Sequence, residues 1–428
     1  FLMRRRPPRS TPLYSSAASD VYKRQPFSQL GGRTIGTVNG EHKGLVGLEY
    51  SFNKELSGRD GEALYQKMVG GGWKPIYDGT ELRSIEGMDI QTTINVNIQD
   101  IAENALLEAL EKNQADYGSV VVMEVNTGQI KAISNLSKNS VGAYYESYNY
   151  AVGSQGSREP GSTFKLASII ALLEDSQLKL HDSIDTGNGS FKFFNETMRD
   201  HKKGGFGTLS IQEIFEKSSN IGIAKLIQNH FGKNPQKFID QLRAMGLYEP
   251  LAFQMYGEGK SYIKTPKDSS WSGTSLPWIS HGYELKMTPL HTLTLFNSVA
   301  NEGKMVQPII VKYIKRADKV IEHFESKVLK EKICSESTLR DVKTMLKGVV
   351  ERGTANNIYT PKYSIAGKTG TAKNVRNGLY TNEYYTSFVG YFPADKPKYS
   401  CIVVILSLIH ISEPTRPLYI SYAVFCLK

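Results

Sequence analysis

Three short motifs contain the side chains best suited to covalent chemistry, and they follow one another along the chain. The first is STFK at 162–165, the second is SSN at 218–220 and the third is KTGT at 368–371. Together they supply a serine hydroxyl, two lysine amines, and further hydroxyl and amide groups. A serine can attack a carbonyl carbon when a neighbouring base removes its proton. The set therefore indicates acyl transfer through a covalent serine ester.

The surroundings of the first motif distinguish it from chance matches. The S-x-x-K pattern also occurs at 51–54 and 261–264, and S-x-N also occurs at 137–139. Ser162 differs from these because it follows EPG and directly precedes the apolar run 164–173, which predicts that a helix begins here. Backbone N–H groups are free at a helix start, and the helix dipole favours negative charge there.

Lys165 is the candidate base because it lies three residues, or about one helical turn, after Ser162. A lysine accepts a proton at neutral pH only if its pKa is lowered, and both burial and a second cation lower it. Lys368 supplies that cation if the third motif packs against the helix start. Ser218 and Asn220 would then bridge the two lysines and relay a proton to the leaving amine. The alternatives are a helix lysine that extends to solvent and an asparagine that caps a helix.

The third motif suits a substrate that ends in a carboxylate. Lys368 offers a cation, and Thr369 and Thr371 offer hydroxyl groups, although both could be ordinary strand threonines. Gly370 has no side chain, so a substrate backbone could lie close to the strand. The N–H of Ser162, at the helix start, is one candidate donor for the oxyanion that forms during acyl transfer.

In these motifs the chain resembles the class B penicillin-binding proteins, which are peptidoglycan transpeptidases. The resemblance covers about residues 26–406 and is carried by EPGSTFK (159–165), KSSNIG (217–222), GKTGTA (367–372), RTIG (33–36), GLE (47–49), GY (282–283) and TPL (288–290). It implies the serine penicillin-recognising fold. This is an α/β (α+β) architecture in which an antiparallel sheet is flanked by helices and is preceded by part of a pedestal module.

The resemblance also implies an activity. Ser162 would attack the penultimate D-Ala carbonyl of a stem pentapeptide and release D-Ala, and an amine from a neighbouring stem would resolve the acyl-enzyme. The N–H of Thr371 would be the second oxyanion donor, and β-lactams would acylate the same serine. No metal or cofactor is expected. The implied partners are peptidoglycan strands derived from lipid II, a glycosyltransferase, and proteins of the division or elongation machinery, with the pedestal closer to the division type.

Two other functions remain open. A serine β-lactamase shares the three motifs but needs a group that activates water, and no dedicated carboxylate base lies near them in the sequence. Glu159 is close to Ser162 but is expected to face solvent. A catalytically silent sensor of β-lactams or peptidoglycan is the second alternative. The pedestal-like residues 26–85 argue against the β-lactamase, and retention of all three motifs argues against the sensor.

Charge and hydropathy limit the remaining classes. The formal net charge is +10, of which residues 1–25 contribute +5 and residues 407–428 contribute +1. No basic stripe with interleaved aromatic residues lies between them, so no nucleic-acid partner is expected. No apolar stretch reaches the roughly 18 residues of a membrane span. Class B relatives usually carry one N-terminal span. The resemblance therefore implies a fragment of a bacterial inner (cytoplasmic) membrane protein whose catalytic domain lies in the periplasm or outside the cell.

Both ends of the chain differ from the middle. Residues 4–25 show no periodicity, and residues 407–428 break off a strand pattern without a turn signal. We interpret both as translated sequencing-adapter read-through, although a basic disordered tail and an unusual C-terminus would look similar. The expected organisation is a non-native, disordered segment at 1–25, a partial dimerisation-type pedestal module at 26–85, a C-terminally truncated transpeptidase domain at 86–406, and a non-native segment at 407–428.

The elements that must position the motifs follow from hydrophobic periodicity and capping signals. Helices are predicted at 97–113, from Phe164, from Ser210, from Thr288 and at 337–350, and strands at 119–125, 129–134, 364–373, 384–392 and 399–406. A hairpin early, helices in the middle and three strands late predict one antiparallel sheet flanked by helices.

The cysteines and histidines indicate no metal site or disulfide framework. Cys334, Cys401 and Cys426 are far apart, and no Cys/His spacing is typical of a metal site. His281 and His291 flank a predicted helix start and are expected to be structural. No role can be assigned to His281 from the sequence.

Overall fold

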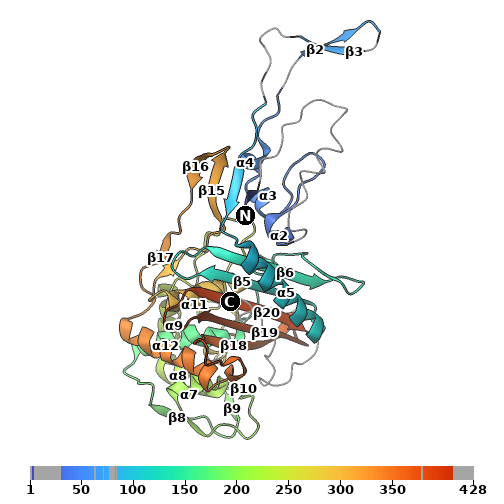
Figure 1. The fold of residues 1–428 in the computed structure, drawn as a ribbon. Helices are drawn as coiled ribbons and strands as arrows, with labels where there is room; N and C mark the ends of the chain where they lie inside the picture. Colours follow the sequence, from blue (N-terminus) through green and yellow to red (C-terminus); the bar gives the residue numbers. More distant parts are fainter. Residues whose placement is uncertain are drawn as a thin grey trace. The chain divides into compact units, whose positions relative to one another are not determined.

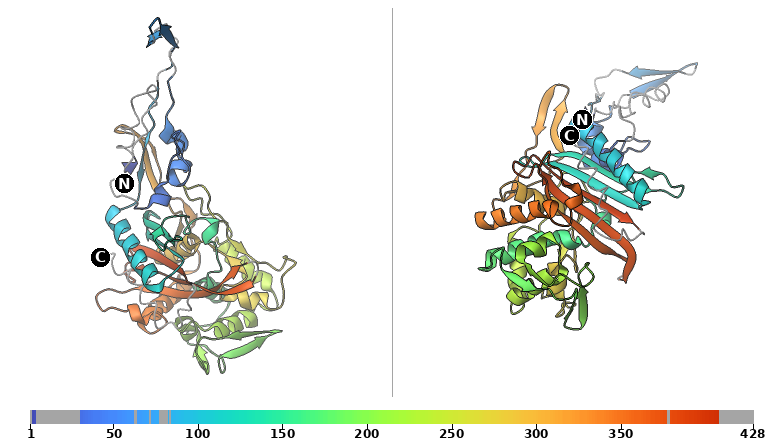
Figure 2. Two further views of the ribbon diagram at one scale, coloured as in Figure 1. Left: turned by 90° about the vertical axis from the view of Figure 1, so that its right-hand side faces the viewer. Right: turned by 60° about the horizontal axis from the view of Figure 1, so that its bottom comes forward.

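The computed structural model describes residues 2–3, 30–61, 64–70, 72–76, 82, 84–376 and 379–407. The chain forms two compact units, each described here by itself (Figures 1 and 2). The first comprises Phe1–Thr93, Gln254–Tyr256 and Ile309–Glu325, and the second comprises Ile94–Phe253, Gly257–Pro308 and Ser326–Lys428. The first unit thus continues past residue 85 and also includes two short segments from later in the chain.

The first unit is built around a four-stranded sheet of order β1-β4-β15-β16. Its strands are β1 (Leu2–Met3), β4 (Asp89–Thr92), β15 (Val311–Arg316) and β16 (Lys319–His323). Leu2 pairs with Gln91 and Met3 with Ile90, so the expected lack of ordered structure at 1–25 does not hold for these two residues. Residues 4–25 and 408–428 lie outside the described part of the chain, and our interpretation of them stays a prediction.

The rest of the first unit consists of short elements. It contains α2 (Gly32–Ile35), α3 (Gly47–Ser51), α4 (Asn53–Ser57), and the hairpin of β2 (Leu64–Met68) with β3 (Gly72–Ile76). Gly36 and Gly47 both have a positive φ, and an added Cβ on Gly36 would lie 1.9 Å from the carbonyl oxygen of Val46. The glycines are therefore required where α2 and α3 approach each other closely.

The second unit is organised around a six-stranded antiparallel sheet of order β18-β19-β20-β5-β6-β7. Its strands are β5 (Tyr117–Glu124), β6 (Ile130–Lys138), β7 (Tyr144–Tyr145), β18 (Ala366–Arg376), β19 (Leu379–Phe392) and β20 (Tyr399–Ser407). The early hairpin and the late three strands therefore join along the β5–β20 pair, and β18 forms an edge of the sheet. An edge strand has backbone groups on one side that do not pair within the sheet.

Helices cover both faces of this sheet. On one face, α5 (Val96–Asn113) packs so closely on β5 that a Cβ added to Gly118 would lie 3.0 Å from the side chains of Leu106 and Leu110. On the other face lies α11 (Pro289–Ala300), whose Asn297 donates to the carbonyl of Val125 and accepts from Ser400 Oγ. Both faces are therefore covered, and every residue of β5 except Glu124 is buried.

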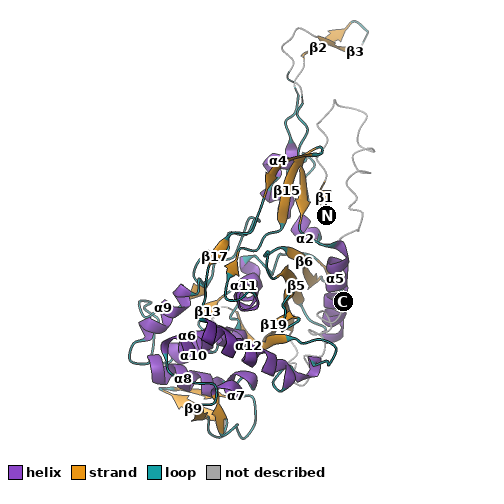
Figure 3. Cartoon of the chain, turned by 60° about the vertical axis from the view of Figure 1, so that its left-hand side comes forward, coloured by secondary structure: helices purple, strands orange, loops and turns teal. Residues whose placement is uncertain are grey.

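The remaining helices gather on the side of the sheet away from α5 (Figures 1 and 3). They are α6 (Lys165–Asp175), α7 (Ile211–Glu216), α8 (Asn220–Phe231), α9 (Pro235–Ala244), α10 (Ser275–Ser280) and α12 (Glu336–Glu351), with the 3₁₀ turns η1 (Ser154–Gly156), η2 (Gly161–Phe164) and η3 (Asn356–Ile358). Short two-stranded pairs decorate them: β8 (Ser183–Asp185) with β11 (Thr208–Ser210), β9 (Ser190–Phe193) with β10 (Glu196–Arg199), β12 (Tyr262–Ile263) with β13 (Leu285–Lys286), and β14 (Met305–Val306) with β17 (Val328–Lys330).

The predicted fold class is confirmed, and every predicted helix and strand is present within a few residues. The capping box at Ser210 and Glu213 forms as expected, and Thr288 caps α11 with Pro289 in its first turn. The predicted turn at 377–378 lies outside the described residues. The sequence analysis did not identify α8, α9 or α10, nor the small strand pairs between α6 and α7.

Three further findings concern predictions made from composition. None of the helices described is long and apolar enough to cross a lipid bilayer. Cys334 and Cys401 are free thiols, and Cys426 lies outside the described residues. Within the described ranges, no group of three or more His, Cys, Asp or Glu side chains could hold a metal ion.

Candidate active site

Ser162 lies in the short 3₁₀ turn η2, directly before α6, and its side chain is half-buried. This turn fits tightly against strand β18. A Cβ added to Gly161 would lie 2.8 Å from the carbonyl oxygen of Thr371, and one added to Gly370 would lie 2.8 Å from Thr163 Cγ2. Gly161 also has φ +57 and donates its N–H to the carbonyl of Gly282. Two glycines thus bring the first and third motifs into contact.

Lys165 begins α6 and is fully buried, at 0% exposure. Its Nζ donates to the Ser218 carbonyl oxygen at 2.7 Å, to Asn220 Oδ1 at 2.7 Å and to Ser218 Oγ at 3.2 Å. Burial lowers the pKa of Lys165 to about 7, and the carboxylate of Asp200 partly opposes this effect. The amine is therefore partly neutral at neutral pH, as a general base must be.

Lys368 lies on β18 and is equally buried, at 0% exposure. Its Nζ donates to Ser218 Oγ at 2.8 Å and to the carbonyl oxygen of Thr369 at 3.0 Å, and it lies 5.9 Å from the centre of the Phe215 ring. Burial and, to a lesser degree, the nearby Lys165 hold the pKa of Lys368 well below its usual value. The hydroxyl of Ser218 thus joins the two lysines. Asn220 was predicted to bridge them as well, but among the described residues it bonds Lys165 and not Lys368.

Ser218 owes its position to an unusual backbone conformation. It lies between α7 and α8 with φ +56, a left-handed conformation that costs a non-glycine residue roughly 1–2 kcal/mol. Its N–H donates to the carbonyl of Phe215. The turn directs both its carbonyl oxygen and its hydroxyl toward Lys165. Such strain is commonly maintained at functional sites.

Asp200 is a residue of this site that the sequence analysis missed. It follows β10, is 9% exposed, and accepts hydrogen bonds from Ser219 Oγ at 2.8 Å and from the N–H groups of Asn220 and Ile221 at 2.6 and 3.1 Å. Asp200 belongs to no recognisable motif and lies 20 residues before Asn220. Only the fold brings it to the start of α8, so no local sequence signal could have identified it.

The threonines and glycine of the third motif occupy different surroundings. Thr369 Oγ1 lies 2.7 Å from Thr354 Oγ1, whereas Thr371 is exposed. The space above Gly370 is taken by Thr163 and by the carbonyl oxygen of Pro160. The absence of a side chain at Gly370 therefore serves a contact within the protein. That it also admits a substrate backbone stays a prediction.

Glu159 does not face solvent as expected. Its side chain is partly buried, and Oε1 accepts a hydrogen bond from the N–H of Glu284 at 2.9 Å. The carboxylate is thus used to hold the backbone beside η2. A group bound in this way is poorly placed to activate a water molecule for ester hydrolysis.

His281 and His291 are both buried. His291 Nδ1 lies 2.7 Å from the capping hydroxyl of Thr288, and burial lowers the pKa of His291 to about 4. Burial and the nearby Lys165 lower the pKa of His281 to about 3. Both imidazoles are therefore neutral at pH 7. His281 packs edge-on against Tyr283 with ring centres 4.8 Å apart, a contact that the sequence did not indicate.

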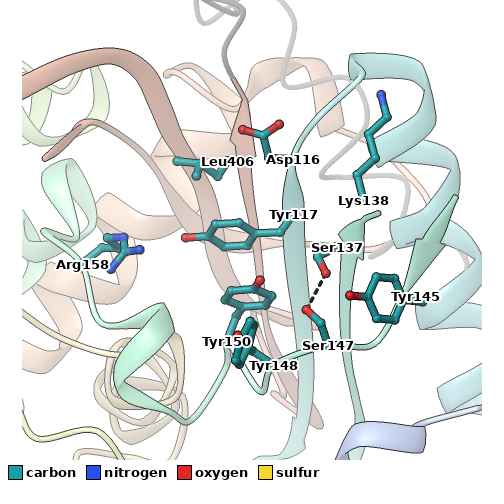
Figure 4. Close-up of a pocket in the computed structure, with 10 residues that line it drawn as sticks. All are labelled: Asp116, Tyr117, Ser137, Lys138, Tyr145, Ser147, Tyr148, Tyr150, Arg158 and Leu406. Atoms are coloured by element: carbon teal, nitrogen blue, oxygen red, sulfur yellow. Dashed lines mark hydrogen bonds between the residues drawn. The ribbon is translucent and has the colours of Figure 1, made fainter. Parts of the chain in front are cut away.

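A separate cavity of about 570 Å³ opens among the starts and ends of β5, β6 and β20 (Figure 4). Tyr117 and Tyr150 stack there with ring centres 4.0 Å apart, and Ser137 Oγ lies 2.6 Å from Ser147 Oγ. Arg158 points toward the Tyr117 ring from the other side. None of the residues predicted to form the active site lines this cavity.

Comparison with known proteins agrees with the fold and the motifs. Residues 118–407 match the family described as "Penicillin binding protein transpeptidase domain". The match covers more than half of the chain. The chain therefore belongs to the penicillin-binding protein transpeptidase family, and the predicted resemblance to its class B members is confirmed.

Individual relatives have low sequence identity to this chain but match most of its length. The chain is 28% identical over 396 residues to the penicillin-binding protein PbpB of Mycolicibacterium smegmatis, a match that covers 88% of this chain and 59% of that protein. It is 27% identical over 386 residues to stage V sporulation protein D of Bacillus subtilis, covering 89% of this chain and 59% of that protein. It is 26% identical over 385 residues to the peptidoglycan D,D-transpeptidase FtsI of Escherichia coli (strain K12), covering 89% of this chain and 62% of that protein. The chain thus spans about three fifths of the length of these relatives.

Solved structures show the same architecture. The apo form of penicillin-binding protein 3 from Mycobacterium tuberculosis superimposes with a TM-score of 0.78 at 25% identity, covering 94% of this chain and 89% of that one. The complex of that protein with aztreonam gives a TM-score of 0.77 at 25% identity, covering 94% of this chain and 88% of that one.

Proposed function

We propose that this chain is the catalytic part of a peptidoglycan D,D-transpeptidase, a serine-type D-Ala-D-Ala acyltransferase of cell-wall synthesis. One observation carries the proposal: two fully buried lysine amines converge on Ser218, beside the turn that carries Ser162. Burying two like charges is costly, and such an arrangement is typical of sites that require altered pKa values. The chain is also 26% identical over 385 residues to a relative named as a peptidoglycan D,D-transpeptidase.

Lys165 is the proposed base for the first half-reaction. In its neutral form it takes the proton of Ser162 as Oγ attacks the carbonyl of the penultimate D-Ala. The C–N bond then breaks, and the nitrogen of the terminal D-Ala leaves after receiving a proton through Ser218. Lys368 keeps the Ser218 hydroxyl in place, and burial favours the neutral form of Lys165. The product is an ester between Ser162 and the stem peptide.

The oxyanion that forms during this attack needs two N–H donors. We assign them to the backbone of Ser162 and Thr371. The carbonyl oxygen of Thr371 faces Gly161, and the N–H and C=O of one residue in an antiparallel strand point to the same side. The N–H of Thr371 is therefore aimed toward the turn that carries Ser162, on the open edge of the sheet.

The same edge suits the carboxylate of the substrate. Lys368 offers its amine as a hydrogen-bond donor, and Thr369 and Thr371 offer hydroxyl groups. A D-Ala-D-Ala peptide and a β-lactam both carry a carboxylate on the leaving side of the reacting carbonyl. In the second half-reaction the amine of a neighbouring stem attacks the ester and restores Ser162.

The remaining parts of the proposal concern the cellular setting. Substrates are peptidoglycan strands derived from lipid II, and the partners are a glycosyltransferase together with proteins of the division or elongation machinery. The catalytic part acts on the outer side of the bacterial cytoplasmic membrane. Relatives of the chain include FtsI and stage V sporulation protein D, and we favour the division machinery, to which the pedestal resemblance also points.

Nitrocefin separates this function from that of a β-lactamase. A transpeptidase holds the ester until an amine arrives, and in this chain Glu159 is engaged by the backbone of Glu284. We expect one burst of hydrolysis, equivalent to one molecule per chain, followed by turnover slower than about one per minute, a barrier of roughly 20 kcal/mol. Sustained turnover at tens per second would identify a β-lactamase instead. No burst at all, with the protein folded, would favour a silent binding protein.

A further inference from the structure

We propose that Asp200 is a positioning residue for acyl transfer, which holds the Ser218–Asn220 segment in the geometry that engages Lys165. The inference rests on the proposed function of this site and adds to it a residue outside the three motifs. Asp200 touches neither Ser162 nor the two lysines through a hydrogen bond in the described structure. It would act through the second motif.

The carboxylate of Asp200 binds three consecutive residues of the second motif and its continuation. Oδ2 accepts from Ser219 Oγ at 2.8 Å, and Oδ1 accepts from the N–H groups of Asn220 at 2.6 Å and Ile221 at 3.1 Å. The N–H groups belong to the first turn of α8, where backbone donors have no partner within the helix. Hydrogen bonds to a charged acceptor are stronger than those between neutral groups. Asp200 therefore fixes the start of α8 from outside the helix.

The residue before Asp200 fixes the orientation of the Asn220 side chain. The carbonyl oxygen of Arg199 accepts from Asn220 Nδ2 at 3.0 Å. Because the amide nitrogen is held there, the amide oxygen faces Lys165, which donates to it at 2.7 Å. Two adjacent residues at the end of β10 thus determine both where the backbone of Asn220 lies and which way its side chain points.

The segment needs this support because Ser218 is strained. Its left-handed conformation, with φ +56, places its carbonyl oxygen 2.7 Å from Lys165 Nζ. The hairpin that carries Asp200 is itself firmly anchored, since its side chains Phe193 and Met198 are buried together with Ile221 and Ala224 of α8. A rigid neighbour is what a strained turn requires in order to persist.

Asp200 also bears a negative charge that acts on the buried amine of Lys165. Its carboxylate raises the pKa of Lys165 against the larger effect of burial. The other titratable groups that influence this amine or are influenced by it are Lys368 from β18 and the neutral His281 after α10. Removal of the Asp200 charge should therefore lower the pKa of Lys165, so that the base stays neutral at lower pH.

The test is the second-order rate constant for acylation by a fluorescent penicillin, measured from pH 5 to 9 on the full chain. For Asp200→Asn we expect a rate lower by about 10- to 100-fold at pH 8, because a charged acceptor of three hydrogen bonds is lost. The acid limb of the profile should also move to lower pH. Asp200→Glu should lower the rate but keep the acid limb near its original position, because the charge remains.

A matched control is Asp185→Asn, which makes the same chemical change on strand β8. The Asp185 side chain is exposed, and among the described residues it accepts from the N–H of Gly187. This variant should keep the original rate and profile. Ser219→Ala removes one of the three hydrogen bonds and should lower the rate by about 3- to 10-fold, which provides a second test if Asp200→Asn does not fold.

The possible outcomes lead to different conclusions about Asp200 and about the proposed function. If Asp200→Asn is folded, as judged by thermal unfolding, and acylates with the rate and profile of the original chain, the positioning role is wrong. A lower rate without any shift of the acid limb would reduce Asp200 to a structural residue and would also contradict the proposal. If the unaltered chain is itself not acylated, the proposed function fails first.

Discussion

Two buried polar clusters lie only two residues apart at the end of α7, and they are built on opposite principles. Glu216 is 5% exposed and pairs with Arg352 Nη2 at 2.7 Å, while Gln212 donates to the same oxygen at 2.8 Å. Ser218, by contrast, receives hydrogen bonds from two lysines, Lys165 and Lys368. The first cluster joins opposite charges, and the second gathers like charges.

The difference indicates which cluster serves stability and which serves function. The ion pair between Glu216 and Arg352 joins the end of α7 to the end of α12, and the carboxylate raises the pKa of Arg352, which favours its charged form. Two like charges without solvent are unfavourable. Burial lowers the pKa of both lysines, and the nearby Lys165 lowers that of Lys368 further. The fold therefore maintains the second cluster at a cost, which is reasonable only if neutral amines are useful there.

Substitution of Lys165 by methionine gives the largest expected effect. The variant lacks the base, so acylation by penicillin should slow by about 10²- to 10⁴-fold, the usual contribution of a positioned general base. Stopped-flow fluorescence with a labelled penicillin measures the rate. Lys237→Met, which alters an exposed lysine paired with Asp175, is the control and should acylate normally. Equal rates for both variants would remove Lys165 from the mechanism.

Substitution of Ser218 by alanine should have the next largest effect. It removes the hydroxyl that joins the two lysines but leaves the carbonyl that accepts from Lys165. We expect acylation to slow by about 10- to 100-fold, toward the lower end of general acid–base effects. Ser219 caps α8 by accepting from the N–H of Gly222 at 2.9 Å, and Ser219→Ala should be less damaging than Ser218→Ala. The opposite order would show that the helix cap matters more than the bridge.

Substitution of Arg352 by methionine should affect the other cluster alone. It leaves Glu216 buried without its cation, and the free energy of unfolding should fall by about 1–3 kcal/mol, because Arg352 itself is half-exposed. Urea unfolding at pH 8 measures this change. Acylation by penicillin should stay within about twofold, an effect below 0.5 kcal/mol. A large loss of acylation in a folded variant would show that the two clusters are coupled.

The smallest expected effect concerns how the free energy of unfolding depends on pH, which should reveal the lysine cluster. The pKa of Lys165 is near 7 in the folded state and near 10.5 in the unfolded state. Between these values the unfolded chain binds more protons, so this group makes stability rise with pH across about pH 7–10. In the original chain, Lys165 should therefore add up to about 1.4 kcal/mol per pH unit to the slope of the free energy of unfolding against pH. Lys165→Met should lack this contribution. Identical slopes for the two proteins would mean that the pKa of Lys165 is not lowered in the folded state.

Local patterns in the sequence could indicate which nearby residues lie close together, but not which distant segments meet. Ser162 and Lys165 are separated by about one helical turn, so their proximity follows from helix periodicity alone. The contact of Lys368 with Ser218 joins residues 150 apart, and only the resemblance of three motifs to a known family suggested it. Hydrophobic alternation likewise predicted the long strands of the sheet, whereas the short strands near Asp200 carry too few residues for a periodic signal.

Backbone conformation is a second feature that could not be predicted from the sequence. Nothing in the residue type of Ser218 predicts a positive φ, which serine rarely adopts. The sequence did not indicate that Gly370 packs closely against Ser387 and Thr163. Glu159 was expected in solvent and instead binds the N–H of Glu284. In each case a partner from a distant segment decides the outcome, and single-sequence patterns do not identify such partners.

The most direct test of the account is the site at which penicillin attaches. The intact mass of the chain should rise by the mass of one drug molecule, and peptide mapping should place the modification on Ser162. Ser162→Ala should remain unmodified under the same conditions while keeping the thermal stability of the original chain. Labelling that persists in Ser162→Ala, or that maps to another residue of the original chain, would contradict the assignment of the nucleophile and with it the proposed mechanism.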